Sequence, residues 1–189
     1  MFGGRRKKNR RTAKEGFINT ALLKEAAAFV LTAAAAAVLS VLLVLAFGKS
    51  KIMEGDSMYP TIESGQRVFI NRLEYQFGKP RKDDIVVFYS SSNKAHTYIK
   101  RIVAASGDRV LISDGFLYVN SELVEDGFDS MEEAGIADEE ITLGIGEYFV
   151  LGDNRNKSED SRNTTIGIVL EDNIIGKVWN IGKRTEKEQ

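Results

Sequence analysis

The most distinct hydrophobic pattern is an uninterrupted apolar run near the start of the chain. Residues 26–47 carry no charged side chain, and Thr32 and Ser40 are their only polar members. A helix of this length measures ~33 Å, which matches the ~30 Å hydrocarbon core of a bilayer. The two hydroxyls are tolerated because each can bond back to a carbonyl of the preceding helical turn. The pattern predicts a transmembrane helix over 26–47.

Two other interpretations of this run stay open. Its nine alanines are only modestly hydrophobic, as in a buried helix of a soluble protein. Residues Ala46-Phe47-Gly48 also resemble the small-x-small site at which a secretory signal is cleaved. The run is longer than the about 7–15 apolar residues of a usual signal. The length therefore favours a retained membrane anchor.

Beyond the anchor the pattern changes to short runs rich in Val, Ile, Phe and Tyr, separated by turn residues. Such spacing without long amphipathic helices is typical of antiparallel β structure. We therefore predict a mainly β fold, an antiparallel folded-over sheet of sandwich or barrel type preceded by one N-terminal transmembrane helix. The candidate strands are Arg67–Asn71, Asp84–Tyr89, Tyr98–Ala104, Arg109–Ile112, Phe116–Val119, Tyr148–Leu151 and Ile174–Trp179.

One segment of this outer region is acidic and contains glycine. Residues 121–140 have Met131 and Ile136 as their only large apolar members after Phe128. A calcium-binding loop is one interpretation, but the EF-hand spacing of acids is missing. We therefore expect an acidic surface insertion that is solvated.

Charge divides the chain at the apolar run. The first 24 residues carry eight Lys or Arg and one acid, Glu15. Residues 48–189 carry 18 basic and 25 acidic side chains, a net charge of -7. Basic residues flanking a span remain on the cytoplasmic side. We predict a cytoplasmic basic tail (1–25), one pass through the plasma membrane, and an extracytoplasmic domain (48–189). The position of the basic cluster makes a nucleic-acid partner the weaker interpretation.

Two residue counts restrict the chemistry. The chain has no cysteine, so disulfides, thiolate metal sites and cysteine nucleophiles are excluded. It has one histidine, His96, so a histidine-rich metal centre is excluded, and a Ser-His-Asp triad would have to use this residue. We expect no cofactor and no metal.

Three short segments concentrate residues with chemical potential. The first is GDSMYPTI at 55–62, the second is YIKRIVAASGD at 98–108, and the third is GDNRNKSEDSR at 152–162. Taken singly, the first reads as an ordinary turn and the third as a polar loop with Asx turns. The mixed charges of the third also suit a hydrogen-bonded network that holds a site in place.

The second segment places Lys100 inside an apolar strand. At a period of two, Tyr98 and Ile102 share its face, and Ile99 and Arg101 lie on the other. A lysine at a strand edge, with its stem packed and its ammonium in water, would look the same. Desolvation instead disfavours the ammonium, and moving its pKa from ~10.4 to ~7–8 takes roughly 3–5 kcal/mol. A neutral amine of this kind could accept the proton of a nearby serine.

The three segments, in this order after a single anchor, resemble those of bacterial type I signal peptidases, in the compact form found in Gram-positive bacteria. Any one of the motifs would be weak evidence, whereas three in order are specific. The likeness spans the anchor and nearly all of the outer domain. It implies a membrane-bound serine endopeptidase that removes signal peptides from exported preproteins, cutting after small-x-small sequences such as Ala-x-Ala.

The resemblance also implies roles for individual residues. Ser57 is the nucleophile and Lys100 its general base, and an acyl-enzyme forms on Ser57. Ser158 hydrogen-bonds the lysine and orients it. Asp160 and Arg162 match a supporting ion pair, and Asp153 pairs with Arg101. The backbone N–H of Ser57 donates to the oxyanion. The substrate is expected to bind as an extended strand, with the following residues at its edges and small pockets: Gly55, Asp56, Met58, Tyr98 and Ile99.

Two positions depart from the family pattern. Some members have, two residues before the nucleophile, a serine that completes the oxyanion hole, where this chain has Gly55. Many have proline at the position of Ser106, which changes a turn and leaves the chemistry untouched.

Three alternatives compete with the Ser-Lys peptidase. Eukaryotic and archaeal relatives use histidine as the base, which would make His96 the base, although we expect it on a surface loop. Self-cleaving SOS repressors share the Ser-Lys dyad but carry a DNA-binding head, for which residues 1–25 are too short. A catalytically silent, membrane-anchored binding or assembly protein with an exported β domain is the alternative from a different class.

Overall fold

The computed structural model describes residues 20–90 and 96–184, in two units, Met1–Leu42 and Leu43–Gln189. The predicted basic tail therefore lies mostly outside the described residues. In the first unit helix α1 begins at Thr20, six residues before the predicted start, and it ends at Phe47. Lys24 and Glu25 extend it because both are good helix formers.

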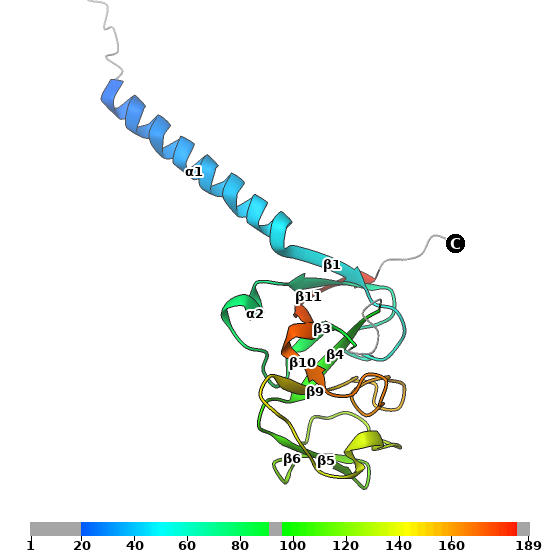
Figure 1. Cartoon of the computed structure of the whole chain (residues 1–189). Coiled ribbons are helices and arrows are strands. Elements are labelled where there is room, and N and C mark those ends of the chain that lie inside the picture. Colours follow the sequence, from blue (N-terminus) through cyan, green and yellow to red (C-terminus); the bar gives the residue numbers. More distant parts are fainter. Residues whose placement is uncertain (1–19, 91–95, 185–189) are drawn as a thin grey trace, which may run out of the picture. The chain divides into compact units, whose positions relative to one another are not determined.

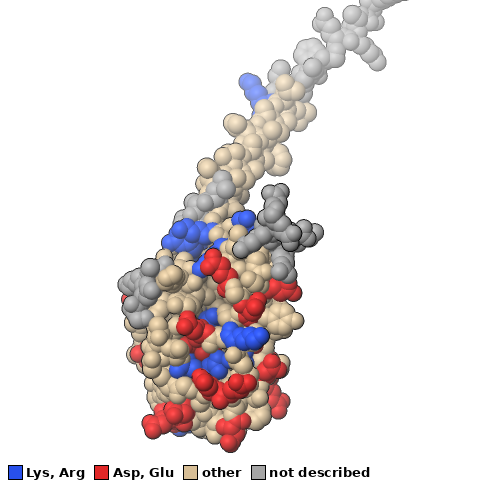
Figure 2. Space-filling model, turned by 90° about the vertical axis from the view of Figure 1, so that its right-hand side faces the viewer, with Lys and Arg blue, Asp and Glu red and all other residues tan. Residues whose placement is uncertain are grey.

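Helix α1 has the composition of a membrane span. Residues Ala21–Val44 have a mean hydropathy of 2.5, and their side chains are exposed. In Figure 2 the helix is tan over most of its drawn length, whereas red and blue are interspersed over the β unit. Thr32 Oγ1 donates to the carbonyl of Ala28 (3.0 Å) and Ser40 Oγ to that of Ala36 (2.8 Å). The predicted return of both hydroxyls to the helix backbone is confirmed.

The helix gives way directly to a strand. A Cβ at Gly48 would lie 2.6 Å from the carbonyl oxygen of Val44, so only glycine fits this approach. Strand β1 (Gly48–Ile52) then pairs antiparallel with β2 (Gln66–Asn71). Both strands belong to the second unit.

The second unit contains a seven-stranded antiparallel sheet (Figure 1). Its order is β1-β2-β11-β3-β4-β9-β10, so the last strand of the chain lies between the second and third. A short helix, α2 (Glu74–Phe77), precedes β3. The remaining strands are β3 (Ile85–Tyr89), β4 (Thr97–Ala104), β9 (Glu147–Leu151), β10 (Val169–Leu170) and β11 (Ile174–Arg184).

A second, four-stranded sheet has the order β7-β6-β5-β8. Asp114 (φ 53°) and Gly115 (φ 81°) form the turn between β5 and β6, because a two-residue hairpin turn of this kind requires positive φ at both positions. The strands are β5 (Arg109–Ser113), β6 (Phe116–Val119), β7 (Glu122–Leu123) and β8 (Ile141–Thr142), with 3-10 turns at η1 (Gly135–Asp138) and η2 (Glu171–Asn173).

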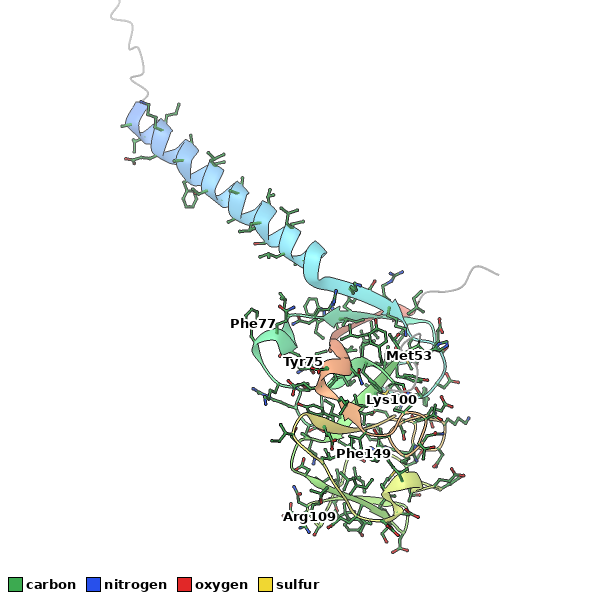
Figure 3. All side chains as sticks on the ribbon, viewed as in Figure 1. Met53, Tyr75, Phe77, Lys100, Arg109 and Phe149 are labelled. Atoms are coloured by element: carbon green, nitrogen blue, oxygen red, sulfur yellow. The ribbon has the colours of Figure 1, made fainter. Side chains whose placement is uncertain are left out.

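Hydrophobic clusters hold these layers together. One cluster joins the two sheets, since Phe149 and Leu151 of β9 pack with Val110 and Leu117 of β5 and β6. Two others belong to the large sheet, and one of them contains Val87, Ile99 and the residues Met53, Met58 and Ile62 that follow β1. In Figure 3 Met53 and Lys100 lie in the part of the β unit that the large sheet occupies, Met53 in the segment after β1 and Lys100 on β4, and Phe149 lies nearer the second sheet. The segment after β1 is thus fixed by core packing.

The predicted fold class is confirmed, because every strand pair in the described β unit is antiparallel. Each candidate strand is present within one or two residues at its N-terminal end. The pattern missed β1, whose residues GKSKI are polar, and the two-residue strands β7, β8 and β10. It also placed the end of β11 five residues too early.

The expectation of a solvated insertion at 121–140 is wrong in one respect. Its acidic side chains are largely exposed, but Met131 (6%) and Ala137 (0%) are buried in the cluster between the sheets. These two residues hold the segment against the core, because removing apolar surface from water stabilises the folded state even where few residues contribute. The segment is therefore part of the core that supports the large sheet.

Candidate active site

Ser57 lies in the irregular segment between β1 and β2. Two backbone hydrogen bonds close turns in this segment, from Tyr59 N–H to Asp56 O (3.1 Å) and from Ile62 N–H to Met58 O (2.8 Å). Met58 and Ile62 are fully buried and hold the turn against the sheet, while Ser57 is partly exposed. A reactive hydroxyl is thus presented by rigid backbone.

A second chain segment fixes this turn from the other side. The backbone N–H of Asn154 donates to the carbonyl of Ser57 (3.1 Å), and Asn154 Nδ2 donates to that of Asp56 (3.1 Å). No motif in the sequence singled out Asn154 for this role. The one sequence feature that pointed to Asn154 was its position in the polar segment 152–162.

Strand β4 brings Lys100 to the serine. Lys100 pairs with Val86 of β3 and is only 3% exposed. Its Nζ donates a hydrogen bond of 2.6 Å to Ser57 Oγ. The structure thus brings together two residues that are 43 positions apart in the sequence.

Burial changes the acidity of this amine. It lowers the pKa of Lys100 from 10.5 to about 8, because the ammonium loses its hydration. The negative charges of Asp160, Glu159 and Asp153 act in the opposite direction and limit the fall. A substantial fraction of the amine is therefore neutral near pH 8 and able to accept a proton.

Arg101, the next residue of β4, forms an ion pair with Asp153. Its Nε donates to Asp153 Oδ1 (2.8 Å) and its Nη2 to Oδ2 (2.7 Å). Hydrogen bonding to the carboxylate raises the pKa of Arg101 further. This two-point contact joins β4 to the segment that follows β9.

Asp160 and Arg162 form a second ion pair with two contacts. Arg162 Nε lies 2.8 Å from Asp160 Oδ1, and Nη2 lies 2.9 Å from Oδ2. Asp160 also accepts a bond from the N–H of Gly152 (3.1 Å). Both side chains are buried, so the carboxylate is saturated with donors as a buried charge requires.

Ser158 differs from the expectation. Its Oγ is buried and has no hydrogen-bond partner among the described residues, so the bond to Lys100 implied by the resemblance is absent. The hydroxyl packs against Gly152, where a Cβ would collide with both Ser158 Oγ and the Ser57 carbonyl. Gly152 is a site residue that the sequence analysis missed, although its lead position in GDNRNKSEDSR was a signal.

The acidic insertion also contributes to the site. Asp126 forms an ion pair with buried Arg155, whose Nε donates to the carbonyl of Gly152 (3.2 Å). Two guanidinium groups lie over the ring of Phe128, that of Arg155 at 4.9 Å and that of Arg101 at 5.6 Å from the ring centre. Nothing in the local sequence indicated these contacts.

A groove of about 370 Å³ leads to the dyad. Four of the five predicted substrate-binding residues line it: Gly55, Asp56, Tyr98 and Ile99. Met58 does not, because it is fully buried in the core, and Met53 takes the predicted apolar place. His96 is exposed at the rim. Lys51, which the sequence analysis did not single out, also lines the groove.

The arrangement has the parts of an acyl-transfer site. A serine hydroxyl lies within hydrogen-bond reach of an amine with a lowered pKa, at the bottom of an open groove. An extended peptide placed in the groove would present its carbonyl to the serine.

Comparisons with known proteins relate this chain to signal peptidases. The family model "Signal peptidase, peptidase S26" matches residues 23–181. Signal peptidase I of Bacillus caldolyticus is 38% identical over 140 residues, covering 67% of this chain and 75% of that protein. Signal peptidase I T of Bacillus subtilis is 36% identical over 134 residues, covering 66% and 68%. A crystal structure of a signal peptidase I from Enterococcus faecalis is 27% identical, covering 54% of this chain and 98% of that one, with a TM-score of 0.44.

Proposed function

We propose that this chain, which belongs to the signal peptidase family, peptidase S26, removes signal peptides from preproteins with Ser57 as nucleophile and Lys100 as general base. It is a serine endopeptidase. The observation that carries the assignment of the dyad is the 2.6 Å contact between Lys100 Nζ and Ser57 Oγ, made by a lysine that is 3% exposed. Both the position and the acidity of the amine suit proton transfer from the hydroxyl.

The chemistry follows from this contact. The neutral amine of Lys100 takes the proton of Ser57 as Oγ attacks the carbonyl carbon of the scissile bond. The resulting ammonium then gives the proton to the leaving amine, and an ester forms on Ser57. Water then attacks this ester while Lys100 accepts one of its protons. The ammonium passes that proton to Ser57 Oγ as the ester bond breaks, and the signal peptide leaves as a carboxylic acid that ionises in water.

The oxyanion is stabilised by backbone. The N–H of Ser57 is the donor that the resemblance implies. Gly55 has a φ of 78°, a conformation that L side chains rarely adopt, so a serine at this position would be strained. The second donor is therefore not a hydroxyl at position 55, and backbone geometry accounts for this departure from the family pattern.

The supporting residues hold the two reactive groups in register. The pair Arg101–Asp153 fixes β4, and the pair Arg162–Asp160 fixes the segment that carries Ser158. Ser158 Oγ and the Ser57 carbonyl both lie close to Gly152, which places this hydroxyl near the dyad, and in the proposed mechanism it orients the lysine once substrate is bound. These residues are positioning residues.

The groove accounts for a preference for small side chains. Gly55, Asp56, Tyr98 and Ile99 offer edges to an extended peptide. Met53 and Ile99 are buried apolar residues that line the groove. In the proposed mode of binding they form its floor and accept small groups at alternate positions of the peptide. A small-x-small sequence places two such groups on one face.

The anchor gives the enzyme its location. Helix α1 is long and apolar enough to cross a bilayer. In the proposed arrangement it crosses the plasma membrane once, with residues 1–25 in the cytoplasm and residues 48–189 outside. Ser57 then follows the span by about ten residues, where a membrane-bound preprotein presents its cleavage site, and the shared membrane raises the effective concentration.

The test is cleavage of a preprotein by the full-length protein in detergent, with mass spectrometry of the products. We expect a single cut after a small-x-small sequence, no product with Ser57→Ala, and continued activity with His96→Ala. A non-catalytic binding protein would release no mature product at all. Cleavage by Ser57→Ala at the same bond, or activity that disappears with a chelator, would overturn the proposal.

A further inference from the structure

One side chain links the two walls of the groove. Lys51 extends from β1, and its Nζ donates to the carbonyl of Thr97 at the start of β4 (2.8 Å) and also contacts the Thr97 hydroxyl. In the described part of the chain these are the hydrogen bonds that join β1 directly to β4. Both residues line the groove. Lys51 therefore crosses it.

The Thr97 carbonyl, which accepts the hydrogen bond from Lys51, lies on an edge of β4 that pairs with no described strand at this point. The backbone groups of Ile102 point to the edge of β4 that faces β3, where they bond to Asp83 and Asp84, the two residues before β3 (2.8 and 2.9 Å). Because backbone groups alternate along a strand, those of Thr97 and Ile99 point to the opposite edge. On that edge β9 pairs with β4 only from Arg101 onward. Thr97–Ile99 is thus the part of β4 to which a substrate strand can add.

The crossing point lies a defined distance from the dyad. Thr97 precedes Lys100 by three positions, which is about 10 Å along a strand at ~3.3 Å per residue. An extended peptide with its scissile carbonyl at Ser57 covers this distance with about three residues. A longer extended stretch would need the Thr97 carbonyl and the space that Lys51 fills.

We propose that Lys51 closes one end of the groove and limits the extended part of the substrate to about three residues before the scissile bond. The inference rests on the proposed function, in which the recognised residues precede the cut. Lys51 is then a specificity-determining residue for the length of chain that is bound.

The surroundings of Lys51 hold its side chain in place across the groove. Its side chain is partly buried, and burial lowers its pKa while the nearby charge of Glu54 acts in the opposite direction. The two oxygen partners from one residue offset the lost hydration. By contrast Lys49, two positions earlier on the same strand, is exposed.

The experiment measures kcat/KM of the full-length enzyme on synthetic peptides that share one cleavage site and carry three, five or seven residues before it. We expect the wild type to gain less than about 2-fold between three and seven residues. In Lys51→Met the same extension should gain at least about 5-fold, as one or two new net hydrogen bonds would provide.

N-methylation of single peptide bonds locates the effect. In the wild type a methyl group on the amide of the fourth or fifth residue before the cut should leave KM unchanged. In Lys51→Met the same methyl groups should raise KM, because these residues then bond to β4. A lysine that only holds the fold together would not produce this position dependence.

Two variants serve as controls. Lys51→Arg keeps a cationic donor and should retain the wild-type length profile, and Lys49→Met removes the same charge from an exposed position and should also retain it. The proposal is overturned if Lys51→Met has the wild-type length profile or loses activity equally on all lengths. Failure of the wild type to cut any of these peptides would instead count against the proposed function.

Discussion

Strand β4 and the segment Gly152–Arg162 each bury basic side chains to a similar depth, but only those of the segment contact a carboxylate. Lys100 is 3% exposed, and Arg155 and Arg162 are 3% and 9% exposed. Each arginine forms an ion pair with a carboxylate, Asp126 or Asp160. Lys100 instead meets a neutral hydroxyl, and among the described residues it forms no ion pair within hydrogen-bond reach.

At similar burial, the presence or absence of a carboxylate partner decides whether a basic side chain stays charged. A carboxylate in contact keeps a guanidinium charged and fixes its geometry. Without such a contact, desolvation dominates and lowers the pKa of Lys100 to about 8. The paired arginines therefore form the scaffold, and the unpaired lysine is left reactive.

The largest expected effect comes from removing the unpaired base. Lys100→Met should lower kcat by about 10³-fold or more, since general-base catalysis is worth about 10²–10⁴-fold. Preprotein cleavage measures this loss, with His96→Ala as the matched control. If Lys100→Met retained activity and His96→Ala lost it, the base would be His96.

Breaking a paired cation should cost stability. Asp160→Asn leaves Arg162 buried without its carboxylate, which is expected to destabilise the fold by about 3–5 kcal/mol. Thermal unfolding in detergent, followed by circular dichroism, measures the change. Glu140→Gln, which breaks the exposed pair with Arg109, should change stability by no more than about 1 kcal/mol. Equal effects of the two variants would contradict the distinction between buried and exposed pairs.

The unpaired lysine should have the opposite effect on stability. Because its pKa is lower in the folded state (about 8) than in the unfolded chain (10.5), the unfolded state binds more protons between these values, and stability rises with pH there. Below pH 8 the full penalty for the buried charge is present. Lys100→Met should therefore be more stable than the wild type at pH 7, by about 1–3 kcal/mol.

This gain should shrink as the pH rises from 8 towards 10.5. Urea unfolding of both proteins at pH 7 and pH 10 measures it. A Lys100→Met variant less stable than the wild type at pH 7 would show that the lysine is not a strained buried charge.

A smaller loss of stability and activity is expected from changing Phe128, the residue of the acidic insertion that contacts Arg101 and Arg155. Phe128→Leu removes the ring that the guanidinium groups of Arg101 and Arg155 both contact, and should cost about 1 kcal/mol of stability. A several-fold fall in kcat with little change in KM is expected, since these arginines position the segments that carry the dyad. Phe128→Tyr should restore both values, whereas equal losses in the two variants would argue against an interaction with the ring face.

The smallest effect is a shift in the pH profile. In the wild type kcat/KM should rise with pH with a midpoint near 8, because the neutral form of Lys100 is the base. Glu159 is exposed, and its charge raises the pKa of Lys100. Glu159→Gln should move the midpoint to lower pH by a fraction of a unit, as an exposed charge contributes about 0–1 kcal/mol. A shift to higher pH would contradict the assignment of this limb to Lys100.

Local patterns were sufficient to predict much of the fold and the candidates for the site. The apolar run gave helix α1, and alternation gave the longer strands, because both depend on neighbouring residues with periods of 3.6 and 2. The motifs pointed to Ser57, Lys100 and the charged segment 152–162. The polar strand β1 escaped detection because its pairing with β2, and not its own pattern, makes it a strand.

By itself the sequence determined the anchor-like helix, the class of the fold and the residue types available for catalysis. Only the tertiary structure decided that β11 lies between β2 and β3, that Met53 rather than Met58 lines the groove, and that Phe128 contacts two guanidinium groups. The contact between Asn154 and Asp56 spans 98 positions, and that between Arg155 and Asp126 spans 29. Such contacts depend on how distant segments pack together, and no local period records them.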